Sequence, residues 1–150
     1  MQAKTYLSIF IGAVGGTLTT ILGGWTAGMS TLVMFMIIDY LSGFMVAAVF
    51  KKSKKSKSGA LESRAGFKGL CRKGMMLFVV AVAYRLDLLV GTEYIRDAVI
   101  IGFCVNELVS ITENAGLMGI PLPSIIKKTI DVLVEKSEGK PGEKNEESEK

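Results

Sequence analysis

In this 150-residue chain, the side chains most able to perform chemistry are acids and amides inside otherwise apolar stretches. Asp39 lies within the apolar run that ends at Phe50, and Glu107 follows Asn106 in a later apolar run. A carboxylate that faces lipid costs roughly 2.5 to 3.5 kcal/mol on insertion scales, so each should face protein or water. These positions predict either pore-facing groups or structural contacts, such as an ion pair of Asp39 with Arg85 or with a lysine at a helix end.

Catalytic and metal chemistry are poorly supported by the composition. The chain contains no histidine, which removes the commonest general base and the commonest transition-metal ligand. Cys71 lies in a basic stretch and Cys104 in an apolar one, and neither has metal-ligand spacing. We therefore predict no catalytic residues, no cofactor and no metal site, and a protein that is not an enzyme.

Small and polar residues recur every four positions in the apolar segment from roughly 96 to 115. The series is Ala98, Gly102, Asn106, Ser110 and Asn114, with Glu107 and Glu113 beside it. Such a stripe can be buried against protein in one state and wetted in another, although a permanently buried set of interhelical hydrogen bonds explains it equally well. The candidate intramembrane polar or pore-facing residues are Asp39, Asn106, Glu107, Ser110 and Asn114.

A second series of small residues lies near the N-terminus. Gly12, Gly16, Thr20 and Gly24 follow one another at four-residue steps, and the first pair forms a GxxxG motif. Small side chains on one ridge let another helix backbone approach closely, which is a main source of attraction in lipid. We predict a helix-packing ridge, used either within the chain or between copies.

Hydropathy predicts several membrane crossings. No charged side chain occurs from residue 5 to 38, which is too long for one crossing of about 20 residues. Glycines near 23 to 28 divide it into helices at roughly 5 to 23 and 29 to 50. Apolar segments follow at 74 to 90 and 96 to 115, the last weakened by its acids. The predicted fold is an all-α membrane protein with three to four transmembrane helices over residues 1 to 118.

The composition of the segment from 51 to 73 predicts a basic loop. It holds nine basic residues against one acid, Glu62, which places it in the cytoplasm by the positive-inside rule. Aromatic residues are not interleaved with the lysines, so topology and attraction to anionic lipid explain the run better than nucleic-acid binding does. The topology-determining residues are Lys51, Lys52, Lys54, Lys55 and Lys57.

The C-terminal part lies outside the apolar region. Residues 119 to 136 combine a proline-containing turn with an amphipathic helix, whose apolar face is Ile126, Ile130, Leu133 and Val134. Residues 137 to 150 form a charged tail that cannot bury enough apolar surface to become ordered. If all four apolar segments cross the membrane, both termini are cytoplasmic.

Four short motifs occur in order along the chain. They are residues 39 to 43 (DYLSG), 63 to 73 (SRAGFKGLCRK), 107 to 114 (ELVSITEN) and 119 to 123 (GIPLP). In that order they resemble the D-x-x-x-G element, the S-x-x-G-x-x-G-x-x-x-K stretch, the E-x-x-S-I-x-E-N segment and the G-x-P-x-P turn of a phage holin family that includes the clostridial toxin-secretion holins and the Cp-1 holin. The resemblance covers roughly residues 35 to 135.

The resemblance implies a multi-pass protein of the bacterial host's cytoplasmic membrane that oligomerises and opens lesions. Such lesions release an endolysin for host cell lysis and viral release, or an exported toxin in some relatives. The implied partners are copies of the chain, membrane lipid and an antiholin, with a functional link to an endolysin. Two other classes stay open: a small ion channel or transporter subunit that uses the intramembrane acids, and an accessory or scaffold protein of a secretion system.

Overall fold

The computed structural model describes residues 2–55 and 62–137, and every regular element in those ranges is a helix. This result confirms the all-helical class. The predicted charged tail, residues 137 to 150, lies almost entirely outside the described residues, as does Lys57. The elements are α1 (Gln2–Ile21), α2 (Ala27–Met45), a π-helix η1 (Val46–Phe50) that continues α2, α3 (Ser63–Val90), α4 (Ile95–Leu117) and α5 (Ser124–Ser137).

Local backbone cues fix the ends of the central helices. The Thr26 hydroxyl accepts a hydrogen bond from the Met29 amide at 3.3 Å, which caps the start of α2. At the end of α3, Gly91 takes a left-handed conformation with φ of 76°, which glycine adopts without steric cost. The turn between α3 and α4 is therefore short, and the two helices return side by side.

The start of α3 differs from the expectation. The apolar segment begins at Gly74, but the helix begins at Ser63, so the second half of the predicted basic loop is helical. Hydropathy locates the apolar part of a helix and carries no information about how far the helix continues beyond it. The basic residues from Arg64 to Lys73 are consequently held on a rigid element.

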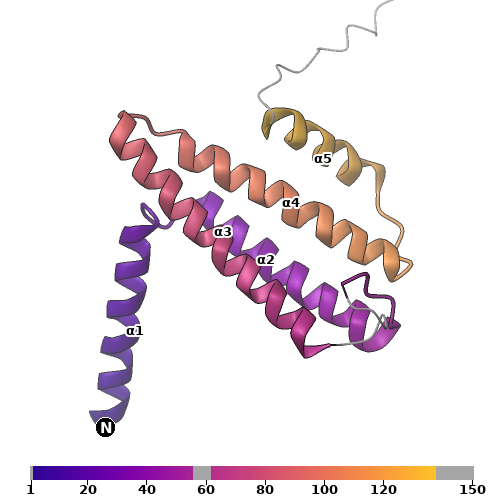
Figure 1. Ribbon diagram of the computed structural model, residues 1–150, viewed down its shortest axis with the longest axis horizontal. Coiled ribbons are helices and arrows are strands. Elements are labelled where there is room, and N and C mark those ends of the chain that lie inside the picture. The colour runs from indigo at the N-terminus through magenta and orange to yellow at the C-terminus, as the bar shows by residue number, and fades with distance from the viewer. Residues whose placement is uncertain (1, 56–61, 138–150) are drawn as a thin grey trace, which may run out of the picture.

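Helices α2, α3 and α4 pack side by side as a bundle, and α5 folds back along α4 (Figure 1). Buried positions on α2 and on α3 recur alternately three and four residues apart, which is the spacing of helices whose axes pack nearly in line. The apolar core of the bundle consists of Leu22, Met29, Leu32, Met36, Met76, Val80 and Ile100.

Helix α1 stands apart from this bundle (Figure 1). Every side chain from Lys4 to Leu18 is exposed. A Cβ added at Gly12 or Gly16 would meet no atom within 4 Å. Within the described part of the chain, the glycine ridge therefore contacts no other helix.

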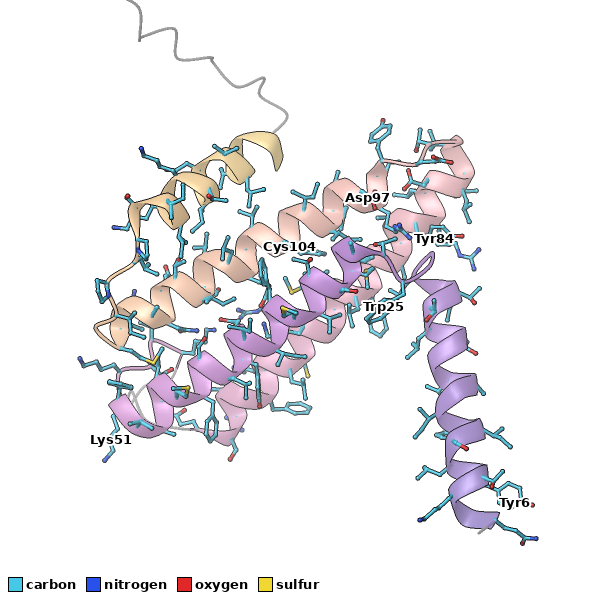
Figure 2. The ribbon with its side chains drawn as sticks, turned by 180° about the vertical axis from the view of Figure 1, so that it is seen from behind. Tyr6, Trp25, Lys51, Tyr84, Asp97 and Cys104 are labelled. Atoms are coloured by element: carbon cyan, nitrogen blue, oxygen red, sulfur yellow. The ribbon has the colours of Figure 1, made fainter. Side chains whose placement is uncertain are left out.

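The bundle carries apolar side chains on its outside as well as in its core. Phe44, Val49, Phe78 and Val82 are among the many large apolar residues that are exposed. Figure 2 shows Lys51 at one end of the bundle and Trp25, Tyr84 and Asp97 towards the opposite end. An apolar belt between a basic end and an end with aromatic residues suits a lipid environment better than water.

One helix among the described residues is long and apolar enough by itself to cross a membrane. It is the continuous segment Ala27–Phe50, which has 24 residues and contains an 18-residue stretch with a mean hydropathy of 2.1. The expected total of three to four crossings stays a prediction.

Helix α5 presents the face that its periodicity predicts. Ile130 is buried, and Ile126, Leu133 and Val134 are half-buried against the bundle. The apolar residues off this face, Ile125 and Val132, are exposed. The burial of its side chains is therefore one-sided, as in an amphipathic helix.

Candidate functional site

Three ionic side chains meet in the interior of the bundle, one from each of its helices. The Lys73 ammonium on α3 donates a hydrogen bond to Asp39 Oδ2 on α2 at 2.9 Å and a second one to Glu107 Oε2 on α4. Asp39 is 5% exposed and Glu107 3% exposed. We call Asp39, Lys73 and Glu107 the ion cluster.

Asn114 on α4 extends the ion cluster by hydrogen bonds to α2. Its amide donates to Asp39 Oδ1 at 3.1 Å and to the Ser42 hydroxyl at 2.9 Å. A Cβ at Gly43 would lie 3.6 Å from the Asn114 amide nitrogen, which is an ordinary van der Waals contact, so α2 and α4 lie close together here. Polar groups of all three helices are thereby tied into one network.

Lys55 adds a second cation from the segment that follows η1. Its ammonium lies 3.9 Å from Asp39 Oδ2, and its side chain is about half exposed. The two buried carboxylates are thus faced by two ammonium groups, one buried and one at the surface. Pairing of this kind offsets the cost of removing charges from water.

The cluster arises because its members occupy core positions of the helix repeat. On α3, Lys73 precedes the buried residues Met76, Val80, Ala83 and Asp87 at steps of three or four. Asp39 follows Leu32 and Met36 on α2 in the same rhythm. A polar side chain at a core position specifies register between helices. The arrangement can lock α2, α3 and α4 in one alignment.

The predicted stripe on α4 does not form a single face. Ala98 and Asn106 are exposed, Gly102 and Ser110 are half-buried, and Asn114 is buried. Residues four apart advance by about 40° around a helix, so the series winds from the surface into the core. The four-residue repeat predicts one polar face, but only its last member, Asn114, is buried in the core. Glu107, beside the repeat, is buried as well.

The structure nevertheless brings the five candidate polar residues to one place. A cavity of about 250 Å³ lies between α2, α3 and α4, and four candidates line it: Asp39, Asn106, Glu107 and Ser110. The fifth, Asn114, contacts it through Asp39. Among the described residues, no group of three or more acids or cysteines could hold a metal ion.

Lys73 is the member of the ion cluster that sequence reasoning missed as a site residue. The alternatives for Asp39 were Arg85 or a lysine at a helix end, and the structure selects a lysine inside α3, while Arg85 is exposed. The signal was present, because Lys73 continues the spacing of the buried residues on α3. Recognising this signal requires knowing that α3 begins at Ser63, so that Lys73 is part of the helix.

A third buried acid, Asp87, organises the opposite end of the bundle. Its carboxylate accepts hydrogen bonds from the Thr92 hydroxyl at 2.6 Å and from the amides of Ile95 and Arg96 at 3.0 and 2.8 Å. It therefore caps the N-terminus of α4 from the end of α3. Arg96 in turn donates to the carbonyl of Gly23 and lies 5.9 Å from the ring centre of Tyr84, which fixes the α1–α2 turn.

An all-helical fold with an apolar exterior, buried ions and one helix long and apolar enough to cross a membrane is typical of a helical membrane protein. Comparison with known proteins gives the family. Residues 16–135 match the bacteriophage holin family, and the chain belongs to it. Family membership suggests a non-enzymatic protein.

Relatives occur in bacteria and in a phage. An uncharacterised protein of Listeria monocytogenes is 38% identical over 110 residues, which is 73% of each chain. An uncharacterised 14.9 kDa protein of Clostridium perfringens is 34% identical over 130 residues, 85% of this chain and 92% of that one. A protein of Bacillus phage phi105 named as a probable holin is 28% identical over 106 residues, 70% of this chain and 73% of its own. No solved structure matches the chain.

Proposed function

We propose that this protein is a holin that oligomerises in the bacterial cytoplasmic membrane and forms lesions large enough to release an endolysin. The family match and the phage relative support a holin role. The observation that carries the proposal is the contrast between a bundle held together by buried ions and an apolar helix α1 that packs against no other helix in the described ranges, 2–55 and 62–137. Such a chain has a stable unit and a separate element for association.

In the proposed membrane arrangement, α1, α2, α3 and α4 all cross the bilayer. The basic end of the bundle, with Lys51 and Lys55, lies on the cytoplasmic side because positive loops are retained there. Four crossings then place α5 on the same side as the basic segment.

Labelling of single cysteines in intact cells tests this arrangement. Ser58→Cys and Ser148→Cys, each in a background that lacks Cys71 and Cys104, should both resist an impermeant reagent until the cells are opened. Labelling at Ser148 but not at Ser58 would mean an odd number of crossings between them and would overturn the arrangement.

Association through α1 supplies the route from single chains to a lesion. The ridge of Gly12 and Gly16 permits close backbone contact between copies, which gives attraction in lipid where apolar burial gives little. Asn106 and Ser110, which line the cavity beside the ion cluster, are the polar groups most accessible to water in an open assembly. The size of the assembly would set the size of the lesion.

The experiment induces the protein in bacteria that contain a cytoplasmic reporter enzyme of endolysin size. We expect abrupt release of the folded enzyme after a delay, because assembly must precede opening. If potassium leaks out while the enzyme stays inside, the acids serve an ion channel or transporter subunit and the holin proposal fails.

A further inference from the structure

The cavity beside the ion cluster has several exposed lining residues, and the part near the basic end of the bundle, which we call its mouth, holds three cations. Lys55, Lys68 and Arg72 line it, and all three are exposed. Lys68 and Arg72 form no ion pair with any residue that the structure describes. These two cations therefore remain available to a ligand.

The acidic groups in the cavity do not cancel this positive mouth. Asp39 and Glu107 lie at the inner end, and both accept hydrogen bonds from Lys73. Glu62, at the start of α3, also lines the cavity, and it has an interaction of its own. A ligand that enters through the mouth therefore meets Lys68 and Arg72 before the two carboxylates that Lys73 holds.

Uncharged features of the mouth also suit an anion with several oxygen atoms. The hydroxyl groups of Tyr40 and Ser53 line the cavity and can donate hydrogen bonds. Gly69 presents no side chain on the α3 wall, and a Cβ there would meet nothing within 4 Å. Space and donors thus lie next to Lys68 and Arg72.

We propose that this cavity binds a phosphate group, carried either by an anionic phospholipid headgroup or by free phosphate. Basic pockets between membrane helices at the cytoplasmic side recognise anionic headgroups, and arginine pairs with phosphate oxygens at two points. The proposal rests on the membrane placement given above and is independent of lesion formation.

Native mass spectrometry of the full chain tests the site. The protein is held in neutral detergent with equal amounts of an anionic and a zwitterionic phospholipid. The wild type should retain the anionic lipid preferentially. The double variant Lys68→Gln/Arg72→Gln should bind it about 30-fold more weakly, since each near-surface cation contributes about a fivefold factor.

Arg64→Gln supplies a matched control, because Arg64 is an exposed cation on the same helix that does not line the cavity. Its binding should stay within about twofold of the wild type if the cavity is the site. Equal losses in the control and the double variant, or no preference in the wild type, would overturn the proposal. Displacement of the lipid by excess inorganic phosphate would assign the site to free phosphate, and retention of the lipid would assign it to the headgroup.

Discussion

Helix α1 and the α2–α4 bundle differ in whether their side chains find partners within the chain. In the bundle, the buried carboxylates of Asp39, Asp87 and Glu107 all have donors within the chain. In α1, the apolar side chains and the glycine ridge have no partner within the described residues. The buried polar groups of the bundle are therefore satisfied within one chain, whereas the apolar side chains of α1, like those on the outside of the bundle, depend on lipid or on another copy.

The largest effect should come from removing the cation at the centre of the bundle. Lys73→Met leaves two buried carboxylates without their shared donor, and we expect the free energy of unfolding in detergent to fall by about 3 to 5 kcal/mol. Circular dichroism during denaturant titration measures it. The triple variant Lys73→Met/Asp39→Asn/Glu107→Gln removes all three charges and should recover much of the loss.

Lys68→Met controls for the loss of a basic residue on the same helix, since Lys68 is exposed. It should change the unfolding free energy by less than about 0.5 kcal/mol. A Lys73→Met protein as stable as this control would show that the ion cluster does not hold the bundle together.

A smaller effect is expected at the other end of the bundle. Asp87→Ala removes the cap of α4 and leaves the amides of Ile95 and Arg96 without their acceptor, which should cost about 1 to 3 kcal/mol. Asp97→Ala is the matched control, because Asp97 is an acid in the first turn of α4 with its side chain 59% exposed. Thermal unfolding should separate the two variants, and equal melting temperatures would remove Asp87 from this role.

The smallest effect on stability is expected in α1, where the effect on association should instead be large. Gly16→Leu should leave the unfolding of the bundle unchanged within about 0.5 kcal/mol, because a Cβ at Gly16 would meet no atom of another described element within 4 Å. The yield of cross-linked oligomers in membranes should fall and lysis should be delayed, because a bulky side chain blocks close helix contact. Normal oligomers from a stably expressed variant would exclude the ridge from assembly.

Sequence patterns predict more of the fold than of the candidate site. Hydropathy located the helices, and periodicity found the buried face of α5, because both depend on residues close in the chain. The partner of Asp39 depended instead on the register between α2 and α3, which no local pattern specifies. The cap by Asp87 was missed for the same reason, since its acceptor role needs the turn at Gly91 to bring α4 back.

The α4 stripe shows a further limit. A repeat of exactly four residues looks like one face in a sequence, but it drifts around the helix and reaches the core only at Asn114. The alternating spacing of three and four residues, which Lys73 and Asp87 share, was the more informative pattern.

Efflux from vesicles that contain both a small dye and a folded enzyme tests the central claim most directly. Purified wild-type protein, reconstituted into these vesicles, should release the dye and the enzyme together once the protein density passes a threshold. Gly16→Leu should release neither at that density, whereas Gly15→Leu, the same change about 100° around α1, should release both. Release of the dye alone by the wild type, or equal efflux from both variants, would contradict assembly through α1 into enzyme-sized holes.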